Sequence, residues 1–199
     1  MDSNSAEPMI YLASNSPRRA ELLAQIGISF IRVKADIEER LLAGESAESY
    51  VTRLALQKAQ AGFLNSAQDR PVLGADTIVV SNQHILEKPR DQAHAKQMML
   101  KLSDSTHQVY TAIAIVDSKK QKQCLVKTSV TFKCLTEQEI ADYWYTSEPK
   151  DKAGGYGIQG IGGKFVTHIS GSYSAVVGLP LYETEQLINV FLKEPPYVG

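Results

Sequence analysis

Cysteine is scarce in this chain of 199 residues, which contains only Cys124 and Cys134. Both fall on the same face of one alternating strand pattern, and a continuous strand would separate them by up to about 33 Å. That separation excludes a disulfide bond between them. Two reduced thiols are typical of a cytoplasmic protein. The sequence also has no cluster of cysteine and histidine with the spacing of a zinc site.

Net charge and long apolar runs are lacking too. The net charge is −1, which gives no electrostatic footprint for binding nucleic acid. No apolar run approaches the roughly 20 residues that a bilayer span requires, so we expect no membrane association. Residues 1–8 are acidic and polar, unlike a signal peptide, and we expect a disordered tail there. Residues 9–199 have an ordinary globular composition and predict one domain, or one domain with two lobes.

An acidic residue interrupts a strongly apolar stretch, residues 71–80. The apolar residues of this stretch predict a strand that is buried on both faces. A carboxylate there, Asp76, costs free energy unless a partner neutralises it. Gly74 and Ala75 leave room beside it for a ligand or another backbone. Asp76 therefore either caps a turn at a bulge or strand end or belongs to a functional site, and taken alone it favours neither.

A serine-rich turn with two arginines follows the first predicted strand, residues 9–13. Ser16 followed by a proline predicts a helix that ends at Gly27. Arg18 and Arg19 stand in its first turn, where the helix dipole and free N–H groups favour an anion. They are either solvated surface residues or phosphate ligands. The convergence of hydroxyl, backbone N–H and guanidinium groups favours phosphate binding.

Three further charged groups are candidates for a site, and the first two each allow two interpretations. Residues 36–39 are acidic and form either a solvated turn or metal ligands, with the turn favoured when they are taken alone. Lys58 lies on the buried stripe of a helix predicted over residues 46–64, so it either extends to water or reaches into a cleft. A hairpin predicted just after the acidic strand would fold Glu87 and Lys88 back towards its carboxylate.

Residues 151–163 hold six of the chain's 13 glycines. They include a literal G-x-G-x-x-G, but no apolar strand precedes it and a strand, not a helix, is predicted after it, which rejects dinucleotide binding. We expect a flexible loop in which Lys152, Tyr156 and Gln159 are the groups able to contact a ligand. The loop is either a surface linker or part of a base-binding site. Its glycines together with one amide and one aromatic ring favour the base-binding site at least as strongly as the linker.

The remaining patterns alternate between strand and helix. Strand patterns cover residues 28–33, 109–116, 124–134 and 164–169, and helix patterns follow Asp91, Thr136 and Pro180. Together they predict an α/β domain of roughly six to eight strands with helices on both sides of the sheet. Because the candidate anion-binding residues sit at both ends of the chain, they must meet in a cleft.

Four short motifs resemble the signatures of the Maf family of nucleotide pyrophosphatases. Residues 14–19, Ser-Asn-Ser-Pro-Arg-Arg, resemble its S-x-S-P-R-R, and residues 74–77 resemble its G-A-D-T. Residues 87–89 are similar to its E-K-P, and residues 151–160 to its D-K-A-G-x-Y-x-I-Q-G. The four motifs occur in the family's order and span most of the chain, which is far more specific than any one of them.

The resemblance implies a cytoplasmic hydrolase that cleaves a nucleoside triphosphate to the monophosphate and pyrophosphate with a divalent metal, Mg²⁺ or Mn²⁺. It implies a twisted mixed β-sheet flanked by helices, with two lobes around a cleft as in inosine triphosphatases, and more weakly a homodimer. It assigns Asp76 as proton acceptor and ties Arg18, Thr77 and Gln159 to substrate choice. The I-Q-G form resembles the branch that acts on dTTP and UTP, in a house-cleaning role that extends to modified pyrimidine nucleotides.

The two lines of reasoning agree on which groups carry the chemistry. The phosphates would be held by a hydroxyl and four cations: Ser14, Arg18, Arg19, Lys58 and Lys88. The metal would be placed, or the attacking water oriented, by three carboxylates: Glu38, Glu87 and Asp76. Whether Asp76 acts as base or as metal ligand stays open. The alternative function is a nucleotide-binding regulator of cell division or septum formation without turnover, and the carboxylate of Asp76 argues against it because binding a triphosphate needs cations.

Overall fold

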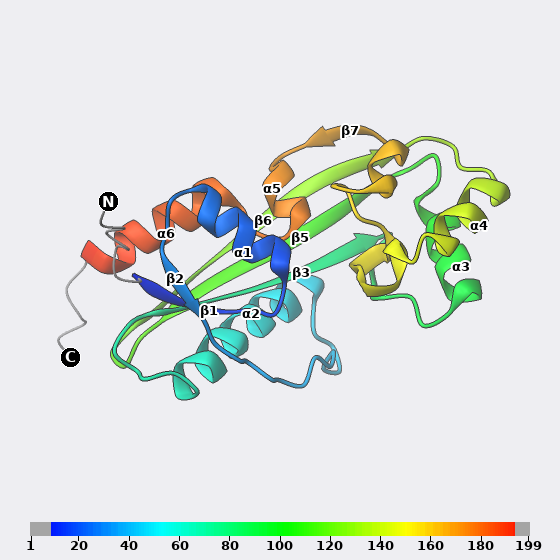
Figure 1. Ribbon diagram of the computed structural model, residues 1–199. Coiled ribbons are helices and arrows are strands. Elements are labelled where there is room, and N and C mark those ends of the chain that lie inside the picture. Colours follow the sequence, from blue (N-terminus) through cyan, green and yellow to red (C-terminus); the bar gives the residue numbers. More distant parts are fainter. Residues whose placement is uncertain (1–8, 194–199) are drawn as a thin grey trace.

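A mixed seven-stranded sheet forms the centre of the molecule (Figure 1). The computed structural model describes residues 9–193, so the predicted tail over residues 1–8 lies outside the described residues. The strands are β1 Ile10–Ala13, β2 Phe30–Arg32, β3 Val72–Ser81, β4 His84–Leu86, β5 Thr106–Val116, β6 Gln121–Phe132 and β7 Val166–Ser170. Their order is β2-β1-β3-β5-β6-β7, with β4 also paired to β3. β1 runs parallel to β2 and β3, and the other pairs are antiparallel, which confirms the predicted mixed sheet.

The helices begin where the local capping signals place them. They are α1 Pro17–Gln25, α2 Ala47–Leu64, α3 Gln92–Leu102, α4 Glu137–Tyr145, α5 Tyr173–Val177 and α6 Leu181–Lys193. Ser16, Ser46 and Asp91 cap α1, α2 and α3 with side-chain oxygens, and Thr136 with Glu139 forms the predicted capping box of α4. None of the helices within residues 9–193 is long and apolar enough to cross a bilayer.

Three hydrophobic clusters divide the molecule into two lobes. In the first lobe, α1 and α6 pack on one face of the sheet around Leu23, Ile113 and Phe191, and α2 packs on the other face around Val51 and Ala112. In the second lobe, α3 and α4 cover the far ends of β3, β5 and β6 (Figure 1). Its buried side chains include the methionines and aromatic residues Met98, Met99, Phe132, Tyr143 and Phe165. The two-lobed α/β architecture is confirmed.

The glycine-rich segment differs from the predicted flexible loop. It consists of three short 3₁₀ segments, η1 Glu148–Asp151, η2 Ala153–Gly155 and η3 Ile161–Phe165. The strand predicted from residue 164 therefore begins only at Val166. Cys134 lies just beyond the end of β6, and both cysteines are free thiols, as predicted.

One edge of β3 is covered in two pieces that leave its middle open. β1 pairs with residues 72–74 and β4 with residues 79–81, whereas β5 pairs along the whole opposite edge. Within the described part of the chain, no strand covers residues 75–78 on that edge. Points where neighbouring strands diverge are where α/β sheets form binding crevices. Asp76 and Thr77 stand in this opening.

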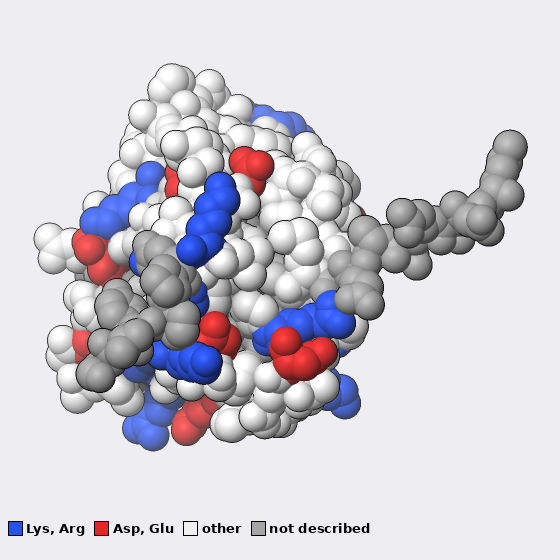
Figure 2. Space-filling model, turned by 90° about the vertical axis from the view of Figure 1, so that its left-hand side faces the viewer, with Lys and Arg blue, Asp and Glu red and all other residues white. Residues whose placement is uncertain are grey.

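Charge on the outside of the molecule is mixed. On the face drawn in Figure 2, which is the left-hand side of Figure 1, basic and acidic side chains lie interspersed. The chain has nearly equal numbers of basic and acidic residues, 21 and 22.

Candidate active site

A cleft of about 970 Å³ lies between the two lobes at the open edge of β3. Its walls come from the α1 N-terminus, the segment before α2, α2 itself, β3, β4 and the glycine-rich segment. The charged residues that line it are Arg18, Arg19, Asp36, Glu39, Lys58, Asp76, Glu87, Lys88, Glu148, Asp151 and Lys152. The sequence-predicted residues Ser14, Thr77 and Gln159 line it as well. The structure therefore brings together every predicted site residue except Glu38.

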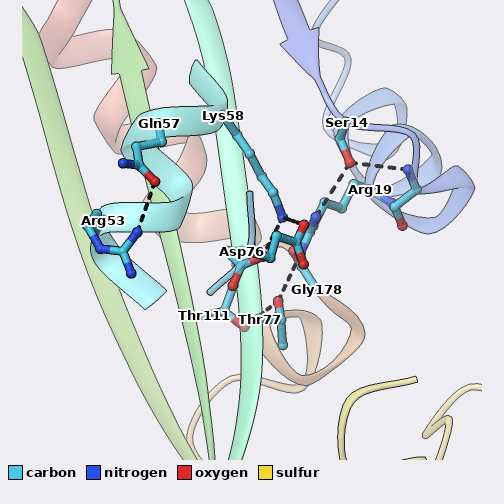
Figure 3. A network of polar contacts seen from close by, with 11 residues as sticks. Ser14, Arg19, Arg53, Gln57, Lys58, Asp76, Thr77, Thr111 and Gly178 are labelled. Carbon is cyan, nitrogen blue, oxygen red and sulfur yellow. Dashed lines mark hydrogen bonds and ion pairs between the residues drawn. The ribbon is translucent and has the colours of Figure 1, made fainter. Parts of the chain in front are cut away.

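Lys58 reaches into the cleft and joins two carboxylates. Its ammonium lies 2.6 Å from Asp76 Oδ1 (Figure 3). It also lies 2.7 Å from Glu39 Oε1. Asp76 is only 6% exposed, so this ion pair supplies the partner that a carboxylate in an apolar strand requires. Of the two interpretations of Lys58, the structure supports the one in which it enters a cleft.

A glycine brings the helix of Lys58 close enough for this contact. A Cβ added at Gly74 would lie 2.5 Å from both the carbonyl oxygen of Ala55 and the backbone nitrogen of Ala59. No side chain fits there, so only glycine lets α2 pack directly on β3. Lys58 precedes Ala59 and is thereby set beside Asp76, two residues along β3 on the same face. The room predicted beside Asp76 is taken by another backbone.

Arg19 enters from the opposite face of the sheet and is held by internal hydrogen bonds. Its Nε donates to the Gly178 carbonyl oxygen over 2.8 Å, and its Nη2 donates to Thr77 Oγ1 over 3.1 Å. A longer contact of 3.5 Å joins Nη1 to Ser14 Oγ. Burial lowers the pKa of the Arg19 guanidinium from its ordinary value. Arg19 thus ties α1 to the end of α5 and to β3, and two of its five N–H groups remain for a ligand.

The hydroxyl of Thr77 has a determined hydrogen-bond direction. Thr111 Oγ1 donates to the Ala175 carbonyl oxygen over 2.7 Å, so its hydrogen is committed. Thr77 Oγ1 lies 3.0 Å from Thr111 Oγ1 and must donate to it, while it accepts from Arg19 (Figure 3). Thr77 therefore retains a lone pair, but no hydrogen, for a ligand. A substrate group that contacts it in this arrangement must be a donor.

Two cations and one amide on the cleft wall are uncommitted. Arg18, Lys88 and Gln159 make no hydrogen bond or ion pair within 4 Å to any residue of the described range 9–193. Arg18 is half-buried, and Lys88 and Gln159 are exposed to the cleft. These groups are therefore available to bind a ligand without losing an internal partner.

The acidic segment before α2 contributes a different residue from the one chosen on sequence. Glu38 is exposed and is not part of the cleft wall, whereas Glu39 contacts Lys58. Burial acts to raise the pKa of Glu39, but the hydrogen bond and charge of Lys58 outweigh it and hold that pKa below its ordinary value. Glu39 is ionised at neutral pH. Glu87 lies on the rim of the cleft, as the predicted hairpin requires.

Tyr50 on α2 is a cleft residue that sequence reasoning missed. Its ring is buried, and burial together with the charges of Asp76, Glu87 and Glu39 raises its pKa to about 12. The three carboxylates are thus near enough to act on one hydroxyl, which stays protonated at neutral pH and can donate a hydrogen bond to an anion. Its apolar helical position was compatible with a core tyrosine, so the sequence carried no signal for this role.

The carboxylates of the cleft fit a divalent cation that binds together with the phosphates of a ligand. Within residues 9–193, no three His, Cys, Asp or Glu side chains are grouped closely enough to hold a metal by themselves. Mg²⁺ is commonly bound through one or two carboxylates together with substrate phosphates. Asp76 and Glu39, which meet at one ammonium group, form such a carboxylate pair. These residues fit a phosphate-bound Mg²⁺ better than a cation in a protein cage.

Tyr156 has a larger structural role than was predicted. It is 5% exposed, and its hydroxyl lies 2.8 Å from Nε2 of the buried His107. Its ring packs edge-on against Phe132, with ring centroids 4.7 Å apart. Tyr156 lines the cleft with part of its ring and is otherwise a core residue of the second lobe.

Comparisons with known proteins agree with this geometry. A family model described as Maf-like protein matches residues 9–191. The dTTP/UTP pyrophosphatase of Shigella dysenteriae serotype 1 (strain Sd197) is 60% identical over 182 residues, which cover 92% of each chain. The dTTP/UTP pyrophosphatase of Escherichia coli O157:H7 and the nucleoside triphosphate pyrophosphatase of Shigella flexneri are each 59% identical over the same shares.

Two solved structures are more distantly similar. The Staphylococcus aureus Ham1 protein covers 92% of this chain and 95% of its own, with 16% identity and a TM-score of 0.44. A nucleoside-triphosphatase / dITP/XTP pyrophosphatase from Mycobacterium abscessus covers 62% of this chain and 73% of its own, with 17% identity and a TM-score of 0.41.

Proposed function

The chain belongs to the Maf-like protein family, and we propose that it hydrolyses dTTP and UTP to the nucleoside monophosphate and pyrophosphate. The observation that carries the proposal is Asp76, a buried carboxylate at the open edge of β3. It faces a cleft in which Arg18 and Lys88 have no hydrogen-bond or ion-pair partner among residues 9–193. Uncommitted cations bind a triphosphate, and a carboxylate among them serves the hydrolysis.

The bond that breaks follows from the products. Release of pyrophosphate requires cleavage of the anhydride linkage between the α- and β-phosphates. Either a water oxygen attacks the α-phosphorus and pyrophosphate leaves, or it attacks the β-phosphorus and the monophosphate leaves. Asp76 is our candidate to accept the water's proton, with its carboxylate oriented by the Lys58 ammonium 2.6 Å away. Arg18 and Lys88 would hold the phosphate oxygens, and Arg19 would contribute the N–H groups that its internal bonds leave over.

A divalent cation is part of the proposal. Asp76 and Glu39 would hold Mg²⁺ or Mn²⁺ together with the phosphates, with Glu87 on the rim, and Glu39 takes the place that the sequence suggested for Glu38. Such a cation neutralises charge on the phosphate oxygens. Its removal by a chelator should abolish pyrophosphate release, and titration with Mg²⁺ or Mn²⁺ should restore it.

The base would be read by Gln159. Its side-chain amide offers both an acceptor and donors, which match the N3–H and a carbonyl of thymine or uracil. This role is supported by its exposure on the cleft wall, where its side chain has no hydrogen-bond partner in the described part of the chain. Cytosine presents a different pattern that a flipped amide can meet in part, so discrimination against CTP should be incomplete.

A direct assay tests the function. The purified chain is incubated with dTTP, UTP, CTP, GTP and ATP in the presence of Mg²⁺, and the nucleotide and phosphate products are separated. We expect dTMP, UMP and pyrophosphate as the main products. Tight binding without any product would instead favour the alternative, a nucleotide-binding regulator of cell division or septum formation. Inorganic phosphate as the first product would contradict cleavage between the α- and β-phosphates.

The proposal also covers location and assembly. The two free cysteines support a cytoplasmic location, the net charge supports the absence of nucleic-acid binding, and the family resemblance supports a homodimer. Cell fractionation, an electrophoretic mobility assay and light scattering on the purified chain test these three proposals separately.

A further inference from the structure

The carboxylate of Glu148, at the start of η1, is bound inside the glycine-rich segment. Its Oε1 accepts from the Tyr143 hydroxyl over 2.7 Å and from the Gly162 backbone N–H over 3.0 Å. Its Oε2 accepts from the Ile161 backbone N–H over 2.8 Å. The Tyr143 hydroxyl in turn accepts from the Gly157 N–H over 3.0 Å. One carboxylate and one phenol therefore hold both ends of residues 157–162.

The glycines of this segment are required by these two side chains. A Cβ at Gly160 would lie 2.2 Å from Glu148 Oε2, and a Cβ at Gly162 would lie 2.5 Å from the Tyr143 hydroxyl oxygen. Both distances are far shorter than any contact that a side chain tolerates. The sequence pattern that resembles a phosphate-binding loop thus leaves space for an internal carboxylate and an internal phenol, and not for a dinucleotide.

Gln159 lies on the turn that this arrangement holds. The Gly160 N–H donates to the Gly157 carbonyl oxygen over 3.2 Å and closes the turn around Ile158 and Gln159. Ile158 packs against two of the hydrophobic clusters, whereas the Gln159 side chain has no hydrogen bond within the described residues and lines the cleft. The direction of the Gln159 amide therefore depends on the backbone positions of Gly157, Ile161 and Gly162.

We propose that Glu148 and Tyr143 are positioning residues for base selection: they act through the backbone of residues 157–162 to hold Gln159, without contacting the base themselves. The inference rests on the proposed function, in which Gln159 reads thymine or uracil. It predicts that disturbing either residue lowers discrimination between bases more than it lowers handling of the triphosphate.

The amide variant Glu148→Gln is the sharpest test. The carboxylate accepts three hydrogen bonds on two oxygens, whereas the amide of glutamine has one oxygen and an NH₂ group. At least one backbone N–H or the phenol of Tyr143 must then face another donor. The substitution is nearly isosteric, so it changes hydrogen bonding while it preserves packing.

The experiment measures kcat/KM for dTTP and CTP in four proteins. They are the parent chain, Glu148→Gln, Tyr143→Phe and the control Glu137→Gln, in which an exposed carboxylate on α4 loses its ion pair with Lys96. We expect the dTTP-to-CTP ratio to fall by about 5- to 100-fold in Glu148→Gln and by less in Tyr143→Phe. The loss should appear mainly as a raised KM for dTTP, with the ratio of the control unchanged.

Two outcomes would overturn the inference. An unchanged dTTP-to-CTP ratio in Glu148→Gln shows that Gln159 is held by other contacts. An equal loss for both nucleotides, accompanied by a lower melting temperature, shows a role in stability alone. If Glu148→Gln does not fold, Gly160→Ala replaces it, because its methyl group displaces the same carboxylate, and the same fall in the ratio is expected.

Failure of the proposed function would be visible separately. A parent chain that releases no pyrophosphate from any nucleotide rejects that function, whatever the variants do. The positioning role is then decided by the dissociation constants of dTTP and CTP in the same four proteins, since the argument concerns how the base is held. Equal ratios of these constants in the parent chain and in Glu148→Gln would reject it.

Discussion

The two walls of the cleft are stabilised in opposite ways. The charged wall is formed by Arg18, Arg19, Glu39, Lys58 and Asp76. There Lys58 neutralises Asp76 and Glu39, and Arg19, on the other face of the sheet, is held by hydrogen bonds to neutral oxygens. On the glycine-rich wall, residues 148–162, backbone N–H groups converge on one carboxylate. The charged wall suits the triphosphate, which is common to all nucleotides. The glycine-rich wall carries the amide that distinguishes their bases.

The comparison shows why the walls differ in composition. The charged side chains at the open edge of β3 come from α1 and α2 as well as from β3 itself. They are distant in sequence, and the sheet brings them together. The glycine-rich wall is local, since residue 148 binds residues 161 and 162. Substitutions on the two walls should therefore separate turnover from base choice.

The largest effect is expected for Asp76→Asn on the charged wall. Loss of a base or metal ligand should lower kcat for dTTP by about a hundredfold or more, while the dTTP-to-CTP ratio and nucleotide binding are retained. Steady-state kinetics and calorimetric binding of dTTP measure the two quantities. Asp142→Asn, at an exposed carboxylate on α4, serves as the control. Near-normal turnover in Asp76→Asn would contradict our assignment of this residue.

Arg18→Ala tests whether the uncommitted cation binds phosphate. Loss of a charge-assisted contact, worth roughly 1.5–3 kcal/mol, should raise the KM for dTTP by about 10- to 100-fold and leave thymidine binding unchanged. Arg90→Ala, at an exposed arginine, is the matched control. Arg19→Ala should also weaken the triphosphate interaction, but with a lower melting temperature, because it breaks bonds to Gly178 and Thr77. An unchanged KM in Arg18→Ala would show that Arg18 is a solvated surface residue and not a phosphate ligand.

Gln159→Glu tests the glycine-rich wall alone. The lost N–H donors leave a base carbonyl facing a carboxylate, which should lower kcat/KM for dTTP and UTP by about 5- to 150-fold. Kinetics with dTTP, UTP, CTP, GTP and ATP measure the change. Competitive inhibition by inorganic tripolyphosphate should stay the same, since it reports on the charged wall. If the variant keeps the parent's ranking and rates, the base is read elsewhere.

The smallest effect is expected from His107, beneath the glycine-rich wall. Burial lowers the pKa of His107 to about 4, so between pH 6.5 and 4 the unfolded chain binds a proton that the folded chain does not. The free energy of unfolding should therefore decrease as pH falls, by about 1 kcal/mol from pH 6.5 to 5.5. In His107→Gln, which can still bind the Tyr156 hydroxyl, this part of the pH dependence should disappear. Urea unfolding at both pH values measures the difference, and equal slopes in the two proteins would contradict the prediction.

Local signals in the sequence predicted much of the fold. Helix starts followed from residues within one turn, such as Ser16 and the Thr136–Glu139 capping box, whose hydrogen bonds need no distant partner. The β3–β4 hairpin followed from an apolar run broken by a turn cluster. Asp76 stood out as a carboxylate in a buried strand. The helix starts and the hairpin survive folding because the groups that satisfy them are neighbours along the chain.

Tertiary structure decided which of several equivalent residues entered the site. Glu38 and Glu39 are indistinguishable in an irregular segment, and only the position of Lys58 selects Glu39. The place of Lys58 depends in turn on the contact of α2 with Gly74. The glycine-rich segment resembled a flexible loop because the carboxylate and phenol that order it precede it in the chain, and their bonds form only when α4 and η1 pack beside it. Sequence identified the chemistry, since residue type limits what a group can do, while long-range packing determined which groups meet.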